Sequence, residues 1–258
     1  MKIGIDVSEH QGIIDWKTAK NFVDFVIIRA GYGSGHVDKQ FKNNVSACIS
    51  NNIPYGIYWF SYAENVEAAR NEAICCMATL KNLKPALPIF FDFEDASYNY
   101  AVKRNNNVEP NKIAKAFINS LKNSGFNAGL YSNLNDLNRW FGSIKNEQPL
   151  WFASWGASSP QVNCDIWQRT DKGTIQGING YVDLNVAYTD FGNAKPVETN
   201  NDSFHSEWLK QEERYKKIVT EILAGAWGNG NSRVHNLSNA GYDPMLAQSL
   251  VNAELKGK

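Results

Sequence analysis

Short hydrophobic runs recur along the first two thirds of the chain and alternate with polar segments. Each run is rich in Ile, Val, Phe, Tyr and Trp and is bounded by Gly, Pro, Asn or Asp, a pattern typical of β-strands. The expected strands span residues 3–8, 24–32, 54–62, 87–95, 127–133, 149–155, 164–170 and 182–188.

Helical periodicity fills several of the segments between these runs. Apolar residues at spacings of three and four predict helices over 38–52, 64–83 and 109–124. Because strands and helices alternate, we predict an α/β fold, an irregular (β/α)8-like parallel barrel of the TIM-barrel type. Connections 156–163 and 171–181 are too short and too rich in Gly and Ser for full helices, so irregularity is expected there and the final strand can be antiparallel. No Gly-rich phosphate loop follows the first strand, which disfavours an open dinucleotide-binding sheet.

The composition of the chain changes after the last expected strand. Residues 192–206 are polar, contain Pro and lack periodicity, which predicts a linker. Residues 1–191 would then form the barrel domain, and residues 207–258 a small all-α helical bundle. In the bundle we expect a helix from about Trp208 to Ala224, a Gly/Asn-rich turn, a short segment to about Ala240, a GYDP turn and a last helix to about Leu255.

Composition narrows the class of protein further. The 258 residues are 43% hydrophobic, which supplies a large core and excludes a disordered or coiled-coil chain. Lys plus Arg and Asp plus Glu both number 26, so no charge excess indicates nucleic-acid binding. The start, MKIGIDVSEHQG, lacks the apolar core of a signal peptide, and no apolar run approaches the roughly 20 residues that span a bilayer. We expect a soluble chain made in the cytoplasm without a signal peptide and without membrane insertion.

The cysteines and histidines do not indicate a metal, a cofactor or a nucleophilic triad. The cysteines have no CxxC or Cys/His ligand spacing, so we expect reduced, buried thiols, no metal and no cofactor. His10 and His36 fall in expected loops and no GxSxG is present, so we interpret them as exposed loop histidines. The cysteines are Cys48, Cys75, Cys76 and Cys164.

The sharpest chemical feature is the run FFDFED. Side chains alternate faces along a strand, so Asp92 and Glu94 point the same way, about 7 Å apart at ~3.3 Å per residue. With Phe90 they would line the barrel interior, whereas Phe91 and Phe93 would face the helices. Mutual repulsion in an apolar site should raise one pKa and give a neutral acid beside an ionised partner, as glycoside hydrolysis requires. The alternative is an acidic strand end that only starts a loop.

Two further carboxylates fall at corresponding places in the expected barrel. Asp6 closes the first strand and Asp183 lies in the last, and these strands are neighbours in a closed barrel. Asp6 alone could cap the following turn, although Asp15 is the better cap for the next helix, and Asp183 alone could be a turn residue. Four carboxylates at one mouth are harder to explain as caps.

Aromatic residues crowd the same strand ends. Their flat faces suit stacking on sugar rings as well as barrel packing, and we interpret the set as a substrate groove. Arg29 and Gln168 are candidate substrate contacts, with structural hydrogen bonding as the alternative. The aromatic residues are Tyr32, Tyr58, Phe60, Tyr62, Tyr131, Trp151, Trp155 and Trp167.

The strand-end blocks over about residues 1–191 resemble, in order and spacing, glycoside hydrolase family 25. The blocks are IGIDVSEHQG, VIIRAGYG, PYGIYWFSYA, PIFFDFED, GLYSN, LWFASW, DIWQ and YVDLN. These hydrolases are lysozymes (N-acetylmuramidases), common as phage endolysins.

The resemblance implies a bacteriolytic, phage- or prophage-encoded hydrolase of the bacterial cell wall. Its bond would be the β-1,4 link between N-acetylmuramic acid and N-acetylglucosamine in peptidoglycan. Glu94 falls on the general acid. Asp92 falls on the carboxylate that stabilises the oxocarbenium charge or orients the 2-acetamido group, and Asp6 and Asp183 fall on the supporting pair.

The tail over about residues 212–255 resembles a cell-wall-binding repeat of phage lysins that recognises muropeptide. Arg233, Tyr242 and Asp243 are the candidate wall contacts. The alternative is that Tyr242 and Leu237 pack the bundle while the Gly and Asn residues shape turns. Two modules on one polymer would raise the effective concentration of each, and an oligomer formed through the tail is left open.

Two other functions compete with the lysozyme interpretation. Another barrel glycosidase, such as a chitinase-like enzyme, also carries paired carboxylates on a strand, but the longer Asp-rich strand motif of that group is absent. A non-catalytic cell-wall-binding protein would be favoured by loss of one of the four carboxylates, and all four are present.

Overall fold

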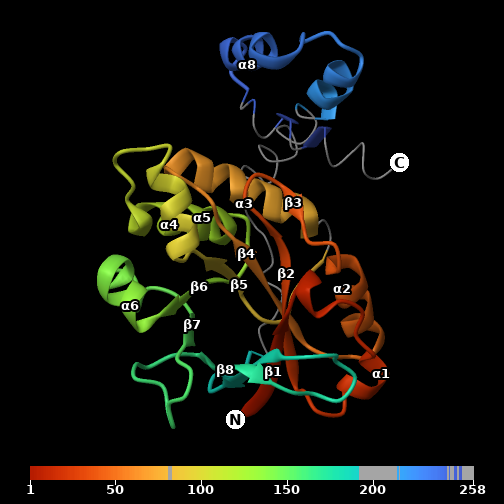
Figure 1. Cartoon of the computed structure of the whole chain (residues 1–258), viewed down its shortest axis with the longest axis vertical. Helices are drawn as coiled ribbons and strands as arrows, with labels where there is room; N and C mark the ends of the chain where they lie inside the picture. Colours follow the sequence, from red (N-terminus) through yellow and green to blue (C-terminus); the bar gives the residue numbers. More distant parts are fainter. Residues whose placement is uncertain are drawn as a thin grey trace.

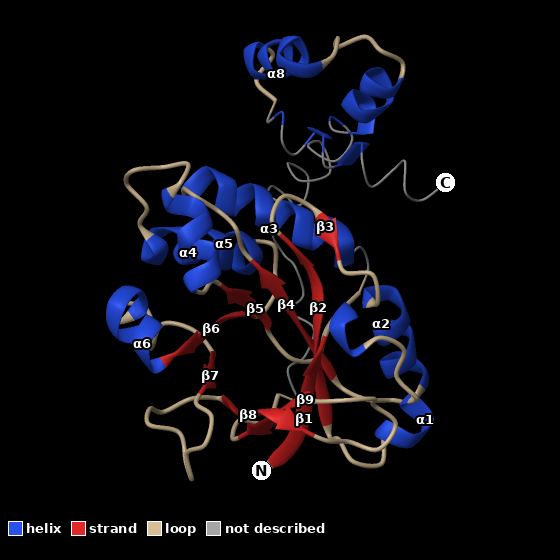
Figure 2. Cartoon of the chain, viewed as in Figure 1, coloured by secondary structure: helices blue, strands red, loops and turns tan. Residues whose placement is uncertain are grey.

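The strands form a closed barrel with helices packed around it (Figures 1 and 2). The sheet order is β1-β9-β8-β7-β6-β5-β4-β2-β3, and an additional β1–β2 pairing closes the ring. The two-residue β3 pairs with β2 in antiparallel register and is an appendage to that ring. The computed structural model describes residues 1–80, 83–191, 214, 216–242, 244, 247–248 and 250–251.

The strands confirm the predicted α/β barrel and its irregular last strand. Apart from the appended β3, neighbours are parallel from β1 through β8, whereas β9 is antiparallel to both β8 and β1. The strands are β1 (Lys2–Val7), β2 (Phe25–Tyr32), β3 (His36–Val37), β4 (Tyr55–Phe60), β5 (Ile89–Asp92), β6 (Ala128–Asn133), β7 (Leu150–Ala153), β8 (Ile166–Gly173) and β9 (Val182–Ala187).

The three long helices also lie where the periodicity predicted them. They are α2 (Phe41–Ser50), α3 (Val66–Leu80) and α5 (Pro110–Asn123). No helix fills the connection from β7 to β8 or from β8 to β9, as predicted.

Several short elements complete the fold. Asp15 caps α1, the helix expected after it, and the other short elements are additional to the prediction. The most consequential is α4, which begins directly after Glu94. The short elements are η1 (Glu9–Gln11), α1 (Trp16–Ala19), α4 (Asp95–Val102), α6 (Leu134–Asp136) and the π-helical turn η2 (Leu137–Phe141).

Alternation along the strands divides the apolar side chains between two cores. Phe90 belongs to the cluster inside the barrel, whereas Phe91 and Phe93 belong to the cluster under the helices, as the period-two pattern predicted. Inside the barrel, the small Gly129 on β6 lies against the Phe90 ring, so large and small residues alternate across neighbouring strands. The four cysteines are free, three of them buried and Cys164 half-buried.

The described part of the tail is helical. Residues 216–223 are helical, and α8 (Gly230–Asn239) follows a turn and buries Leu237 completely. The short segment predicted before Ala240 is this ten-residue helix, and two glycines with positive φ, Gly228 and Gly230, shape the turn that leads into it. The predicted linker 192–206, the predicted helix start at Trp208, the predicted end at Leu255 and Asp243 lie outside the described residues.

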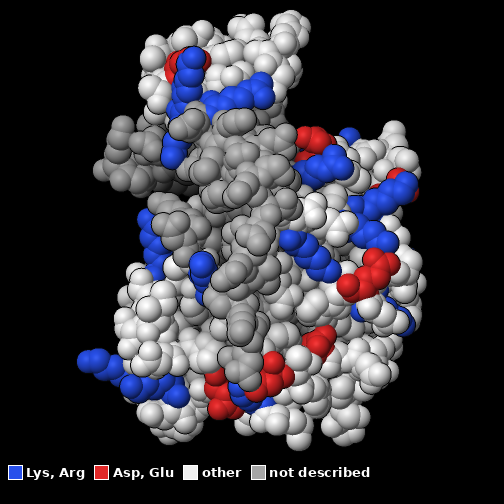
Figure 3. Space-filling view, turned by 180° about the vertical axis from the view of Figure 1, so that it is seen from behind, with Lys and Arg blue, Asp and Glu red and all other residues white. Residues whose placement is uncertain are grey.

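The surface charge of the described residues is mixed in sign. Figure 3 shows Lys and Arg side chains interspersed with Asp and Glu on the face opposite to that of Figure 1. Among the described residues, no helix combines the length and the apolar character needed to cross a membrane.

The interior packing predicts a large effect of one methyl group. A Cβ at Gly129 would lie 2.5 Å from the carbonyl oxygen of Pro149 and 2.8 Å from the Phe90 ring. We expect Gly129→Ala to lower the free energy of unfolding by about 2–3 kcal/mol, because neither backbone nor barrel core can move aside. Urea denaturation measures this loss. Gly180→Ala, with positive φ but open space around the new Cβ, should lose only about 1 kcal/mol; equal losses would contradict the packing argument.

Candidate active site

Four carboxylates from three strand ends meet at the mouth of the barrel. The β1–β9 register sets Asp6 directly opposite Asp183. The strand β5 ends at Asp92, but the backbone stays extended at Glu94 (φ −121°, ψ −173°), so both side chains keep to one face. Electrostatic interactions join Asp6 to Asp183 and Asp92, and Glu94 to Asp92 and Asp183. The structure therefore brings together the four acids that the sequence singled out.

Asp6 is held by two amide side chains. Gln168 Nε2 donates to Asp6 Oδ2 at 3.0 Å, and Asn185 Nδ2 donates to the same oxygen at 2.7 Å. Aromatic donors orient both amides in turn: Trp151 Nε1 donates to Asn185 Oδ1 at 2.7 Å, and Tyr131 OH donates to Gln168 Oε1 at 3.0 Å. Side chains from β6, β7, β8 and β9 thus fix the position of the Asp6 carboxylate on β1.

Asp6 and Asp183 ionise as a pair. Burial and the neighbouring Asp183 charge raise the pKa of Asp6 well above its usual range, and the two amide donors oppose the rise only in part. The pKa of Asp183 is also raised, mainly by burial, while its hydrogen bond with Asp6 lowers it. A proton held by Asp6 and shared with an ionised Asp183 accounts for both directions.

Asp92 is a buried carboxylate with one unused oxygen. Its exposure is 6%, and its Oδ1 has no hydrogen-bond partner among the described residues. Burial raises its pKa well above the usual range, Glu94 and Asp6 raise it further, and Arg29 opposes them. Burying a carboxylate oxygen without a hydrogen-bond donor is energetically unfavourable. A donor group of a ligand could therefore bind at this oxygen.

Glu94 lies at the start of α4 and is a neutral acid for much of the acidic pH range. Its backbone N–H donates to Ser97 Oγ at 3.2 Å at the helix start. Burial raises the pKa of Glu94 to about 6, and the charges of Asp136, Asp95 and Asp183 contribute in that order. The pKa of Asp92 is raised as well, so the two acids retain protons as a pair, and the predicted division into a neutral Glu94 and an ionised Asp92 stays a prediction.

Six of the eight predicted aromatic residues form two groups. Tyr58 and Tyr131 pack against Trp151 inside the barrel, with ring centroids 5.8 and 4.5 Å away. Tyr32, Phe60 and Tyr62 form a half-buried rim group, in which Tyr62 lies 6.5 Å from Tyr32 and 5.2 Å from Phe60. Trp155 is 55% exposed and donates to Gln168 Oε1 at 3.1 Å.

One aromatic residue was placed wrongly by the sequence analysis. Trp167 belongs to the core cluster outside the barrel, and its Nε1 donates to the Ser154 carbonyl at 3.0 Å. Its neighbours Ile166 and Gln168 point inward, so strand alternation turns Trp167 away from the mouth.

Arg29 and Gln168 have structural contacts of their own. Arg29 Nε donates to Asp38 Oδ2 at 2.8 Å and its NH2 group donates to Glu9 Oε1 at 2.9 Å, which ties together the loops after β1 and β2. Gln168 uses both ends of its amide on Asp6, Tyr131 and Trp155. The structural alternative therefore accounts for these hydrogen bonds, and substrate binding by either residue stays a prediction.

Three residues of the site were missed by the sequence analysis. Asn185 is completely buried against Asp6, the Tyr100 ring lies tilted 5.0 Å from the Tyr62 ring, and Asp136 interacts electrostatically with Glu94. Asn185 follows Asp183 by two residues in the last strand, so the same face rule that linked Asp92 to Glu94 could have found it. No comparable sequence signal indicates Asp136, which lies beyond the end of β6.

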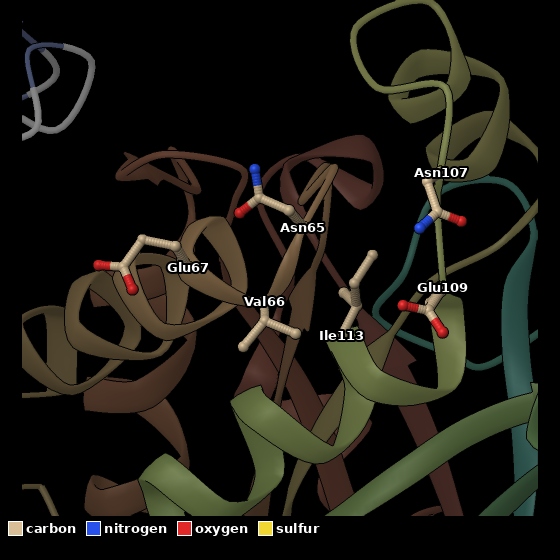
Figure 4. Close-up of a pocket in the computed structure, with 6 residues that line it drawn as sticks. All are labelled: Asn65, Val66, Glu67, Asn107, Glu109 and Ile113. Carbon is tan, nitrogen blue, oxygen red and sulfur yellow. The ribbon is translucent and has the colours of Figure 1, made fainter.

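A separate hollow of about 330 Å³ lies outside the ring of strands, between the N-terminal ends of α3 and α5 (Figure 4). Its two acids are matched by nearby cations, Glu67 by Arg70 and Glu109 by Lys112. Its lining residues, which exclude the four carboxylates, are Asn65, Val66, Glu67, Asn107, Glu109 and Ile113.

The described tail candidates are engaged in internal contacts. Arg233 donates to the Gly228 carbonyl, Asn229 Oδ1 and Gln248 Oε1, each at 2.9 Å. Tyr242 packs edge-on against Trp227 at 5.8 Å and beneath the Arg214 guanidinium at 4.1 Å. These contacts match the packing alternative, and wall binding by Arg233 and Tyr242 stays a prediction.

The chain matches two known protein families. A model of glycosyl hydrolases family 25 matches residues 5–178, more than half of the chain. The chain belongs to glycosyl hydrolases family 25. A second model, the CW_7 repeat, matches residues 216–255, which overlap the tail resemblance.

Three relatives illustrate what this family 25 chain is similar to. The lysozyme of Streptococcus phage Cp-7 is 25% identical over 264 residues, covering 96% of this chain and 68% of the relative. The autolytic lysozyme of Clostridium acetobutylicum is 26% identical over 184 residues, covering 70% and 54%. The structure of the modular autolysin LytC from Streptococcus pneumoniae with a synthetic peptidoglycan ligand matches with a TM-score of 0.65 and 32% identity, covering 72% and 46%.

The family 25 chain spans about half the length of the autolytic lysozyme and of LytC. The agreement of fold with such relatives confirms the barrel assignment.

The buried acids of the family 25 barrel predict a pH-dependent cost to folding. Because the folded-state pKa of Asp92 lies above its ordinary value near 3.8, its contribution is favourable at low pH and is lost as pH rises through the folded pKa. We expect Asp92→Asn to raise the free energy of unfolding by about 1–2 kcal/mol at pH 7 and by almost nothing at pH 3. Urea denaturation at both pH values measures this, with the exposed Asp190→Asn as the control. A loss of stability at pH 7 would contradict the repulsion.

Proposed function

We propose that the protein is an endolysin-type lysozyme that hydrolyses the β-1,4 bond between N-acetylmuramic acid and N-acetylglucosamine in peptidoglycan. The observation that carries this proposal is the convergence of four carboxylates at one barrel mouth, with the pKa of Glu94 raised to about 6. Membership of family 25 and the wall-lytic relatives support the same reaction class. The LytC complex, whose ligand is a synthetic peptidoglycan, supports the choice of polymer.

Glu94 acts as the general acid in this proposal. A protonated carboxyl delivers its proton to the leaving glycosidic oxygen, and the ionised form cannot do so. Burial favours the protonated form, and the start of α4 fixes the backbone of Glu94. The acid is therefore oriented before substrate arrives.

Asp92 acts on the positive charge that develops on the sugar. Its Oδ1 has no donor among the described residues, so it can accept an N–H from the 2-acetamido group or face the oxocarbenium-like centre. Asp6 and Asp183 act as the supporting pair, because their shared proton limits the negative charge beside Asp92. The aromatic rim of Tyr32, Phe60 and Tyr62 offers half-buried faces for the flanking sugars.

The tail is proposed as a wall-binding module joined to this barrel. A barrel domain over 1–191, a linker over 192–206 and a helical domain over 207–258 would place two binding units on one polymer and raise their effective concentration. The CW_7 match at residues 216–255 supports the assignment of the tail. Action on the bacterial wall after synthesis in the cytoplasm, phage or prophage origin and association of copies through the tail stay predictions.

The first test replaces the proposed acid. We expect Glu94→Gln to bind purified cell walls as the parent does but to release muramic-acid reducing ends at least ~100-fold more slowly, because the amide cannot donate the required proton. Mass analysis of the soluble fragments identifies the bond that the parent cleaves. Chitin assayed beside peptidoglycan separates this function from that of a chitinase-like enzyme.

A matched control keeps the charge change but moves it away from the mouth. Glu67→Gln, in the hollow between α3 and α5, should retain the parent rate within about twofold. Near-normal lysis by Glu94→Gln would remove Glu94 from the mechanism, whereas absence of reducing ends from the parent on peptidoglycan would overturn the function itself.

A further inference from the structure

We propose that Asp136 is a positioning residue whose negative charge keeps Glu94 protonated. This inference rests on the proposed function, since it concerns the proposed acid. It adds a fifth carboxylate to the four that the strands supply.

The structure fixes Asp136 rigidly. Asp136 is 2% exposed and forms two hydrogen bonds with Asn133. The Asp136 N–H donates to Asn133 Oδ1 at 3.0 Å, and Asn133 Nδ2 donates to Asp136 Oδ2 at 2.7 Å. Asn135 Nδ2 approaches the other carboxylate oxygen at 3.4 Å. Burial raises the pKa of Asp136, and the amide donors of Asn133 and Asn135 together with Arg139 oppose that rise and favour the ionised form.

The same segment lies beside the start of α4. In the parallel β5–β6 pair, Asp92 is the register partner of Tyr131, so Asn133 and Glu94 each lie two residues beyond that pair. On the far side of Asp136, Arg139 donates to Asp95 Oδ1 at 3.2 Å, and Asp95 is the residue after Glu94. Strand register at one end and the Arg139–Asp95 ion pair at the other therefore place the segment 133–139, with Asp136 in it, beside the start of α4.

Positive and negative charges near Glu94 have opposite effects on its ionisation. The N-terminus of α4 favours its ionised form, because unpaired backbone N–H groups there carry partial positive charge. Asp136 is the largest charge contribution that raises the pKa of Glu94, followed by Asp95 from α4 and Asp183 from β9. Glu94 also interacts with Asp92 on β5 and Tyr131 on β6, and Arg139 lies beside Asp95 and Asp136. Asp136 is thus the buried charge that offsets the helix terminus.

The variant Asp136→Asn tests this role while keeping the shape of the side chain and the acceptor for Asn133. Loss of the Asp136 charge should lower the pKa of Glu94 by about half a pH unit or more. The basic limb of the kcat/KM profile on peptidoglycan should move to lower pH by the same amount. From a starting pKa of about 6, a half-unit fall makes the variant about threefold slower at pH 7 and nearly unchanged at pH 4.5.

The matched control is Asp95→Asn. The Asp95 side chain is 67% exposed and paired with Arg139, so solvent and salt screen its charge and the limb should move by less than about 0.2 pH unit. Thermal unfolding of each variant shows whether the fold is retained. A loss of rate that is equal at all pH values, or an unmoved limb, would overturn the proposal for Asp136.

A second measurement keeps this result separate from the proposed function. Carboxyl NMR titration of Glu94 in the parent and in Asp136→Asn reads the pKa without any substrate. A lower Glu94 pKa in the variant supports the electrostatic role even if the parent cleaves a different bond, and an unchanged pKa contradicts the role even if the parent is a lysozyme.

Discussion

The structure depends on the repulsion between carboxylates that are buried together at the barrel mouth. Bringing negative charges out of water into one apolar opening is unfavourable, so protons must be retained or donors supplied. The chain does both. Gln168 and Asn185 donate to one oxygen of Asp6, and the raised pKa values of Asp6, Asp92 and Glu94 keep protons on the cluster. The polar scaffold behind the acids is therefore as necessary as the acids themselves.

Topology decides which residues can take part in this cluster. In a fully parallel barrel, only residues at the C-terminal ends of strands reach the mouth. The strand β9 runs the other way, so a residue near its start, Asp183, lies at the same end as Asp6. Asn185 follows on the same face and reaches Asp6 from the side. The reversal of a single strand thus supplies one proposed site acid and one of the amides that hold another.

Much of the fold was predictable because the spacing of apolar and polar residues along the chain is a local property of the sequence. The strand ranges, the three long helices and the inward direction of Phe90 all follow from hydrophobic period, and they were confirmed. The same reasoning failed for Trp167, because aromatic residues at a strand end were counted without assigning their faces. The helix α4 was missed because its short sequence, DASYNYAV, carries little apolar periodicity.

The site was predictable only where chemistry lay on strands. Asp6, Asp92, Glu94 and Asp183 could be placed at one mouth because strand register carries over from sequence to space. Asp136 could not, since it reaches the site through the cap at Asn133 and the π-helical turn that follows, and neither has a strong sequence signature. The roles assigned to the acids stay predictions, because position and pKa establish only what each group is able to do.

Shared protons also govern how single substitutions should be interpreted. Removing Asp6 deletes a carboxyl and also changes the ionisation of Asp183 and Asp92, because each raises or lowers the pKa of another. A loss of activity in an Asp6 variant would therefore combine a direct effect with an altered charge beside the substrate. Groups that act as a unit give losses that do not add. The contributions of the individual acids can therefore be separated only with double variants. In these, Asp6 and Asp183 are neutralised together and the result is compared with that of each single substitution.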